Sequence, residues 1–452
     1  MDSESDWRRS VTASERYDNI QRLAKAVAAA GLSQSAFSLE SEAYKNANSR
    51  EEYDAACSSL PGVTGKDLPP QQEPPDTDVQ HSSPGITIGR FQSCHYIASG
   101  VTSAVYRSQA YALKVIVENH AIEPHNPHRE AKILESLRAT EPPNIIPLLE
   151  TFRDREQRFV LVFPYQPFTL AHLLSRHHQA TTHAPRPLPT ALTRPIITAL
   201  FRALHHLHTQ GTIHRDVKPS ALLLSSAEPT SPSQIVLSDF GTAWHPTLSP
   251  PHEPAHHKIL DVGTGPYRAP ETLFGNRAYG PAVDLWAAGT TLAECLLAGS
   301  SKSKSTNKPY RSATNDEDDG DDGSDGSDGE HSSSDNTAGG TRTLFASRAA
   351  HEDGNQLGLI LSIFRTLGTP TPATWPEAAA FRTPPFEMYR VFPGRVATEG
   401  WEGVLPGAGA EWRELVAGLV RYESRERVTA GEALQFACLK GERVEGQNEG
   451  GL

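Results

Sequence analysis

The feature that most constrains this chain is a series of charged residues set in a fixed order among apolar segments. The stretch HRDVKPSALLL covers residues 214–224, and SDFG follows at residues 238–241. Three letters such as Asp-Phe-Gly recur by chance, so SDFG alone is weak evidence. Its place after HRDVKPS and before GTGPYRAPE, at residues 263–271, makes the combination specific. The sequence therefore predicts that charged side chains from distant parts of the chain meet in one cleft.

Composition limits the class of protein. The chain has 452 residues and a formal net charge of −12, and much of the acid lies in one run, NDEDDGDDGSDGSDGE. This balance argues against general nucleic-acid binding. The four cysteines lie far apart without a C-x-x-C pair, which argues against disulfides and structural zinc and favours a reducing, intracellular compartment. No leader pattern or bilayer-length apolar run occurs, so we expect no membrane partner. The acidic charge balance likewise predicts no DNA partner.

Residues 7–60 have the pattern of a small helical domain. The runs TASE at residues 12–15 and SREE at residues 49–52 are capping boxes, and apolar residues at helical spacing follow the first of them. Gly31 is placed to end that helix. We therefore predict a three-helix unit whose last helix ends near Cys57.

The rest of the chain divides by composition. Residues 61–85 are rich in proline and polar residues, which predicts a disordered linker. Over residues 86–440, β-rich runs with a single helix around HREAKILESLRA give way to a mostly helical pattern, which predicts an α+β, bilobal fold with a small β-rich lobe and a large helical lobe. Within this domain, residues 300–340 cannot bury enough apolar surface to fold, so a disordered acidic insertion is expected.

Phosphoryl transfer needs cations, a metal-holding acid and a carboxylate beside the attacking hydroxyl, and the chain supplies these in order. Lys114, in YALKVI, is expected to contact the α- and β-phosphates of a nucleotide, and Glu130 to pair with it from the helix of the first lobe. Asp216 is expected to accept the proton of the substrate hydroxyl, and Lys218 to offset charge on the moving group. Asp239 is the candidate magnesium ligand. Taken alone, a lysine in a strand or a glutamate in a helix is usually a solvated surface residue. The order and spacing of these residues along the chain indicate the phosphoryl-transfer roles.

From about Arg90 to Lys440 these motifs resemble a eukaryotic protein kinase. LILSIFRTLGTPTPATWPE and YRAPE resemble the cyclin-dependent kinase branch, and DVGTGPYRAPETLFG resembles the single-subunit fungal kinases that activate cyclin-dependent kinases. The resemblance implies ATP and Mg²⁺ as cofactors, and transfer to serine or threonine hydroxyls of proteins, with cyclin-dependent kinases as the expected substrates. It also implies a nuclear or cytoplasmic location. The helix of Glu130 lacks the sequence by which cyclins grip such kinases, so we expect cyclin-independent action.

The resemblance also implies the residues that line the nucleotide pocket. The glycine-rich loop runs from Ala98 to Val105 and keeps only its central glycine, Gly100, although each added Cβ narrows the approach of the backbone to phosphate. The single-subunit activating kinases share such a degenerate loop. Val105 and Ala112 are expected to cover the adenine, and Leu223 belongs to the same predicted pocket.

A hinge segment, VFPYQP, follows the last strand of the first lobe. Phe163 is expected at the gate of the rear pocket. Pro164 has no N–H, but its predicted position requires only a carbonyl that accepts from the adenine amino group. Gln166 is expected to supply the remaining backbone contacts, so this proline is compatible with ATP.

Ala221 stands where the kinase pattern has a metal-binding asparagine. A methyl group cannot ligate magnesium, and the loss of one electrostatic stabiliser lowers a rate by roughly a hundred- to a thousandfold. Two interpretations therefore remain: a working or attenuated kinase, and a pseudokinase scaffold acting in transcription through its N-terminal domain. The sequence favours the first, because the charged residues of the cleft are all retained.

The segment from 242 to 264, TAWHPTLSPPHEPAHHKILDVGT, has no threonine at the usual late regulatory position. Although Arg215 could bind a phosphate, this predicts activity without phosphorylation of the segment. Thr264 is expected to contact Asp216 and Lys218 instead. The histidines of the segment are irregularly spaced among prolines, which predicts solvated side chains rather than zinc ligands.

Three further residues are given structural roles by the kinase resemblance. Glu271 is expected to form an internal ion pair with Arg427, and Asp284 to anchor the loop around Asp216.

The N-terminal unit, with NANSREEY at residues 46–53, resembles a KIX-type domain of fungal transcriptional coactivators. This resemblance implies a hydrophobic groove that accepts an amphipathic activation helix of a transcription factor. The alternative is a helical cap without a partner.

Overall fold

The structure is a computed structural model. The predicted insertion at residues 300–340, the predicted linker at 61–85 except for Gly85, and most of residues 7–60 lie outside the residues that it describes. The described residues are 49–58, 85–117, 122–179, 186–297, 343–345, 356–383 and 400–440, with 11, 19, 22, 23, 39, 40, 43, 44, 47, 385 and 397.

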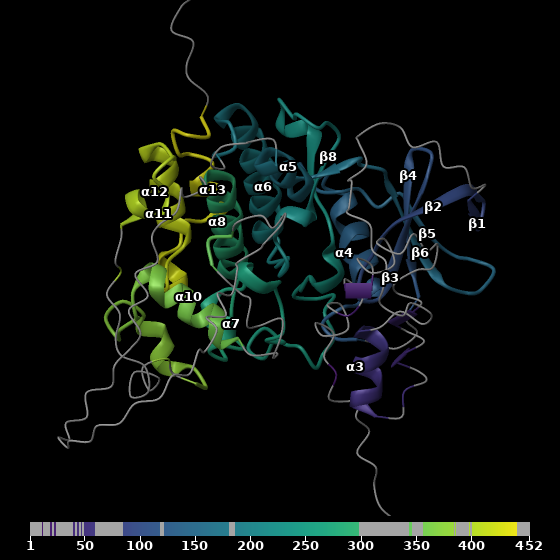
Figure 1. Cartoon of the computed structure of the whole chain (residues 1–452), viewed down its shortest axis with the longest axis horizontal. Helices are drawn as coiled ribbons and strands as arrows, with labels where there is room; N and C mark the ends of the chain where they lie inside the picture. The colour runs from purple at the N-terminus through teal and green to yellow at the C-terminus, as the bar shows by residue number, and fades with distance from the viewer. Residues whose placement is uncertain are drawn as a thin grey trace, which may run out of the picture.

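A curved antiparallel sheet forms the small lobe, on the right in Figure 1. The side chains of β4 alternate between the two faces of the sheet. Leu113 and Val115 lie on one face, in an apolar cluster of the small lobe. Lys114 and Ile116 lie on the other face, where Ile116 joins the main core. The sheet has six strands in the order β1-β2-β3-β4-β6-β5. Their bounds are β1 Ile86–Ile88, β2 Phe91–Ser99, β3 Ser103–Ser108, β4 Tyr111–Ile116, β5 Glu150–Arg153 and β6 Phe159–Pro164.

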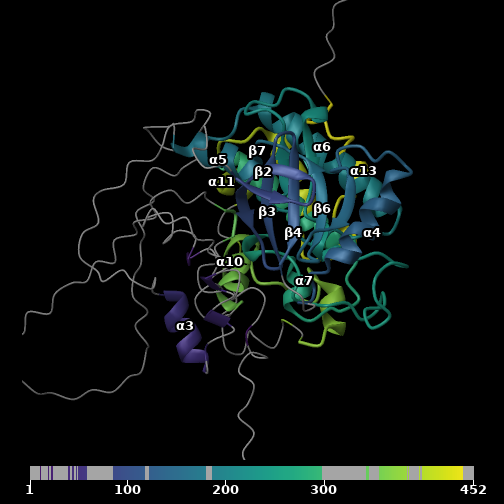
Figure 2. The same ribbon diagram turned by 90° about the vertical axis from the view of Figure 1, so that its right-hand side faces the viewer.

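The helix predicted around HREAKILESLRA is α4, Pro127–Arg138. Asn126 caps it by accepting a hydrogen bond from the Arg129 N–H at 2.8 Å, and Pro127 occupies its first turn. Its buried face, including Ile133 and Leu137, packs into the main core. Figure 2 shows the sheet with α4 beside it and the large lobe behind.

The large lobe is mainly helical. Its central helix is α8, in which every residue after the first is buried, as expected for a helix surrounded by others. One continuous core joins the lobes, from Ile116 to Leu439. No described helix is long and apolar enough to cross a membrane. The helices are α5 Leu170–Gln179, α6 Thr190–Thr209, α7 Pro270–Leu273, α8 Ala282–Leu296, α10 Leu357–Leu367, α11 Trp401–Val404, α12 Ala410–Leu419 and α13 Ala430–Ala433.

A second, three-stranded sheet lies where the sequence pattern indicates mostly helix. It consists of β7 Phe168–Thr169, β8 Leu222–Leu224 and β9 Ile235–Leu237, in that order. Strands of two or three residues are too short to show a period, so the pattern did not reveal them. The α+β, bilobal fold itself is confirmed.

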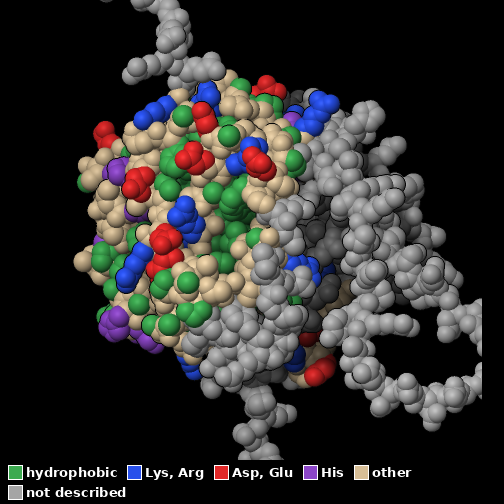
Figure 3. Space-filling view, turned by 90° about the vertical axis from the view of Figure 1, so that its left-hand side faces the viewer, with side chains coloured by type: hydrophobic (Ala, Val, Ile, Leu, Met, Phe, Trp, Pro, Cys, Tyr) green, Lys and Arg blue, Asp and Glu red, His purple; other side chains and the backbone are tan. Residues whose placement is uncertain are grey.

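The exposed face of the large lobe carries charge of both signs. Figure 3 shows acidic and basic side chains interspersed on this face rather than gathered in a field of one sign.

The third helix of the N-terminal unit is α3, Arg50–Ser58, and its predicted cap is present, with the Glu52 N–H donating to Ser49 Oγ at 3.2 Å. The Tyr53 hydroxyl donates to the buried Glu40 carboxylate at 2.7 Å. A small apolar cluster surrounds this bond, and Val117 of the small lobe packs against it. The first two predicted helices lie mostly outside the described residues.

A buried ion pair fastens α7 to the end of the large lobe. Arg427 donates two hydrogen bonds to Glu271, at 2.6 and 2.7 Å, and both side chains are fully buried. The same guanidinium donates to the Ala282 carbonyl and lies 5.1 Å from the Trp286 ring centroid. The ion pair expected from the sequence is therefore present.

We predict that Glu271→Gln destabilises the protein by roughly 3–5 kcal/mol, because the Arg427 charge then stays buried without its counter-charge. Thermal or urea denaturation measures the loss. Glu402→Gln is the matched control, because Glu402 also pairs with an arginine, Arg413 at 3.3 Å, but is 86% exposed. If both variants lose equally little free energy of unfolding, the buried pair does not stabilise the lobe.

Candidate active site

One lysine ammonium group bridges acidic side chains of the two lobes. Lys114 on β4 donates to both carboxylate oxygens of Glu130 on α4, at 2.9 and 2.8 Å. Its ammonium also lies 3.3 Å from Asp239 Oδ1, just beyond β9. Three elements from both lobes thus meet at one nitrogen atom, as the order of the motifs predicts.

Burial and charge act against each other at this cation. Burial alone disfavours a charged lysine, but the carboxylates of Glu130 and Asp239 outweigh it and raise the pKa of Lys114 above its ordinary value. Desolvation likewise acts to raise the pKa of Asp239, but the Lys114 and Lys218 ammonium groups hold that pKa well below the ordinary range. Both groups are therefore ionised at neutral pH.

A second cluster lies on the catalytic side of the cleft. Lys218 donates to Asp216 Oδ2 at 2.6 Å and to the Thr264 hydroxyl at 2.9 Å. The Thr264 hydroxyl in turn donates to Asp216 Oδ1 at 2.6 Å. The contacts expected of Thr264 are present, and both Asp216 oxygens are held in fixed directions.

The loop around Asp216 is anchored from below by α8. The buried Asp284 carboxylate accepts hydrogen bonds from the backbone N–H groups of His214, at 2.9 Å, and Arg215, at 2.8 Å. The His214 ring stacks edge-on against Phe240, with ring centroids 4.8 Å apart. Arg215 and Asp239 both have a positive φ, 70° and 64°, a strained conformation that surrounding contacts must hold.

The strands place most of the predicted nucleotide-pocket residues side by side. Ala98 pairs with Val105, which pairs with Lys114 on the next strand, and Ala112 pairs with Phe163 beyond it. The Gly100 N–H donates to the Ser103 carbonyl at 2.8 Å and closes the loop between β2 and β3. Leu223 lies on β8 in the second sheet.

The hinge follows β6, which ends at Pro164. The next amide, that of Tyr165, donates to the Ala110 carbonyl at 2.8 Å and is therefore occupied. The contacts expected between the backbone of Gln166 and the nucleotide stay a prediction.

The donor set for magnesium is small. Among the described residues no group of three or more acids, histidines or cysteines could hold a metal. Ala221 is 1% exposed, and the Ser238 hydroxyl donates to its carbonyl at 2.9 Å. Asp239, 47% exposed, is the carboxylate available in the cleft. The site fits a magnesium ion that takes most of its ligands from phosphate and water, which is how Mg²⁺ is usually held.

Two residues near the cleft were missed by the sequence analysis. His125 is half-buried just before α4; burial lowers its pKa, although Asp239 and Asp216 act to raise it. Glu253 is 1% exposed in the segment before Thr264 and binds arginines of two other elements. The sequence indicates that Arg215 could bind an anion, but not that Glu253 supplies it.

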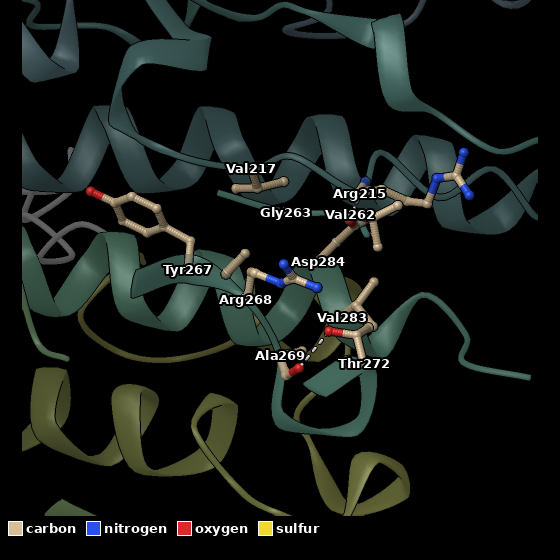
Figure 4. A pocket seen from close by; sticks show the side chains of 11 residues that line it. Arg215, Val217, Val262, Gly263, Tyr267, Arg268, Ala269, Thr272, Val283 and Asp284 are labelled. Carbon is tan, nitrogen blue, oxygen red and sulfur yellow. Dashed lines mark hydrogen bonds between the residues drawn. The ribbon is translucent and has the colours of Figure 1, made fainter. Parts of the chain in front are cut away.

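A separate small cavity lies behind the catalytic loop (Figure 4). It has a volume of about 10 Å³, room for about one water molecule, so it is not a substrate site. In Figure 4 the Arg268 side chain lies beside it, and this residue donates to Asp261 at 3.1 Å and to the Leu260 carbonyl at 2.9 Å.

The sequence model of the protein kinase domain family matches residues 95–437, which is most of the chain. The chain belongs to the protein kinase family. The pairing of Lys114 with Glu130 and the placement of Asp216 and Asp239 in one cleft agree with this assignment.

Curated relatives of this kinase include serine/threonine-protein kinases and a cyclin-dependent kinase. Serine/threonine-protein kinase CAK1 of Saccharomyces cerevisiae is 25% identical over 312 residues, covering 63% of this chain and 76% of the relative. The csk1 kinase of Schizosaccharomyces pombe is 26% identical, covering 77% and 92%. Cyclin-dependent kinase 7 of Carassius auratus is 27% identical, covering 76% and 81%.

Among solved structures, the CAK complex from Chaetomium thermophilum bound to ATP-gamma-S is similar to this kinase. The match has a TM-score of 0.55 at 23% identity and covers 77% of this chain and 90% of the other. At this identity the likeness shows the fold. The roles given to individual cleft residues remain predictions.

We predict that Thr264→Val lowers kcat by about 100-fold, because Asp216 and Lys218 lose the hydroxyl that fixes their directions. The KM for ATP should change little, since Thr264 contacts neither Lys114 nor the hinge. Steady-state kinetics measure both constants. Thr264→Ser keeps the hydroxyl and should retain most activity; equal kcat values for valine and serine would contradict the role.

We predict that Ala221→Asn raises kcat by up to about 100-fold and lowers the Mg²⁺ concentration needed for half-maximal rate, because an amide oxygen is added to the metal donor set. Titration of the rate with Mg²⁺ measures both effects. Ala221→Leu has the same branched shape as asparagine but no oxygen, and it controls for crowding. If the two variants behave alike, position 221 has no part in metal binding.

Proposed function

We propose that this kinase transfers the γ-phosphate of ATP to the activation-loop threonine of cyclin-dependent kinases, and so activates them. The observation that carries the proposal is the assembled cleft, in which Lys114, Glu130 and Asp239 meet while Asp216, Lys218 and Thr264 form a second cluster. The names of the yeast and fish relatives support the choice of substrate.

The chain's own residues supply positioning and charge. Lys114 binds phosphate oxygens and is held in place by Glu130. Asp216 accepts the proton of the attacking hydroxyl, while Lys218, 2.6 Å from it, balances charge on the moving group. Asp239 would hold magnesium, which neutralises phosphate charge when bound. Thr264 keeps the carboxylate of Asp216 directed at the substrate.

The alternative, a pseudokinase scaffold, is less well supported. Its basis is Ala221 and the altered glycine loop, yet the charged residues retained in the cleft are paired in the arrangement that phosphoryl transfer requires. A protein selected only for binding does not need both Asp216 oxygens fixed by neighbouring groups.

Two further points belong to the proposal. We assign a nuclear or cytoplasmic location, where cyclin-dependent kinases would be reached. We also keep the KIX-type interpretation of residues 7–60, with a transcription-factor activation helix as the partner. Its support is the NANSREEY pattern together with the capped helix α3 and the apolar cluster that Tyr53 and Cys57 join.

We predict that the protein transfers radiolabelled phosphate from ATP to a cyclin-dependent kinase with an unphosphorylated activation-loop threonine. Asp239→Asn should lower this transfer by at least about 100-fold, because the carboxylate of the metal site is lost. A target whose activation-loop threonine is replaced by valine controls for the site of transfer. Equal signals from wild type and Asp239→Asn would leave only the scaffold.

A further inference from the structure

A single carboxylate fastens the segment before Thr264 to both sides of the cleft. Glu253 is 1% exposed. Its Oε2 lies 3.3 Å from Arg129 Nη1 on α4, and its Oε1 accepts a close hydrogen bond from Arg215 Nη1 in the catalytic loop. Two buried guanidinium groups from different parts of the chain therefore share one acid.

Two further hydrogen bonds hold Glu253 in place. The Ile259 N–H donates to Glu253 Oε1 at 3.1 Å, and the Trp244 indole N–H donates to the Glu253 carbonyl at 2.9 Å. Lys258 adds a third buried cation, 4.7 Å from the Trp244 ring centroid. We call Glu253, Arg129, Arg215 and Lys258 the Glu253 cluster.

Each arginine of the Glu253 cluster is the chain neighbour of a cleft residue. Arg129 precedes Glu130, the partner of Lys114, and Arg215 precedes Asp216. Without an anion between them the two guanidinium groups repel one another: burial and then Arg215 lower the pKa of Arg129 to about 10, and Glu253 opposes this. The position of α4 relative to the catalytic loop thus depends on Glu253.

In kinases switched by phosphorylation, a phosphate on the activation segment forms such arginine contacts, and the segment and the helix bearing the glutamate then become ordered. We propose that Glu253 is a built-in substitute for that phosphate: a positioning residue that keeps the segment and α4 in the active arrangement without modification. The inference rests on phosphoryl transfer in this cleft and not on which protein receives the phosphate.

The contacts around Glu253 also show that a carboxylate replaces a phosphate only in part. A phosphate has three acceptor oxygens and nearly two negative charges, whereas a carboxylate has two oxygens and one charge. Accordingly, Arg129 Nε and Arg215 Nη2 are buried without a hydrogen-bond partner among the described residues. Glu253 thus joins the arginines but leaves a donor on each unsatisfied.

The first test measures ATP hydrolysis, which needs no protein substrate. Glu253→Gln keeps the shape and removes the charge, and we expect kcat per folded molecule to fall by about 100-fold because Glu130 and Asp216 are displaced. Glu253→Asp should restore part of this loss. Glu402→Gln, at an exposed pair in the large lobe, should leave kcat unchanged. A merely structural role would lower the melting temperature of Glu253→Gln but leave kcat of the folded fraction intact, which would overturn the proposal.

Phosphatase treatment tests whether the rate of ATP hydrolysis depends on phosphorylation of residues 242–264. Wild-type protein shown by mass spectrometry to carry no phosphate on residues 242–264 should keep its full rate. If removing phosphate abolishes the rate, a modified residue rather than Glu253 positions the segment and the proposal fails. A wild type that hydrolyses ATP but does not modify cyclin-dependent kinases would refute the proposed substrate and leave this inference standing.

A third measurement does not depend on turnover. Hydrogen exchange should become faster in both α4 and residues 242–264 of Glu253→Gln, since Glu253 joins these two elements. Arg129→Gln should raise exchange in the same two regions, and the double variant should add little to either single change, because the two residues act through one contact. Unchanged exchange in α4, or additive effects, would overturn the proposal.

Discussion

The cleft depends on the Lys114 ammonium group, which two carboxylates share. Glu130 and Asp239 come from a helix of the small lobe and a loop of the large lobe, so the pairing forms only when the lobes are closed against each other. Burial penalises this cation, and the two acids more than compensate. A change that displaces α4 therefore removes Glu130, the acid that holds the Lys114 ammonium group in place.

The sequence predicted the parts of this arrangement in which chemistry is tied to order along the chain. Lys114, Asp216 and Asp239 lie in motifs whose succession is specific, and the bilobal fold follows from the change from β-rich to helical patterns. The short strands β7 to β9 were missed because two or three residues show no period. Glu253 was missed for a different reason: its partner Arg129 is 124 residues away, and a lone glutamate beside prolines and histidines is an ordinary loop residue.

Ala221 shows how a local substitution can be accommodated by its surroundings. Its carbonyl accepts hydrogen bonds from both the backbone N–H and the hydroxyl of Ser238, each at 2.9 Å, next to Asp239. The backbone that carries Asp239 is thus fixed independently of any side chain at position 221. The geometry of the cleft at Asp239 therefore does not require an asparagine side chain at position 221.

The charge balance of the Glu253 cluster explains why an acid is required there. Burial and the nearby Arg215 lower the pKa of Lys258 to about 8, although Glu253 acts in the opposite direction. Three cations thus lie near one carboxylate, and burial makes Lys258 a weaker base than an exposed lysine. A neutral residue at 253 would leave two guanidinium groups that cannot discharge, so they would separate, carrying α4 and the catalytic loop apart. The Glu253 cluster therefore adds charge pairing to the apolar packing that joins α4 to the large lobe.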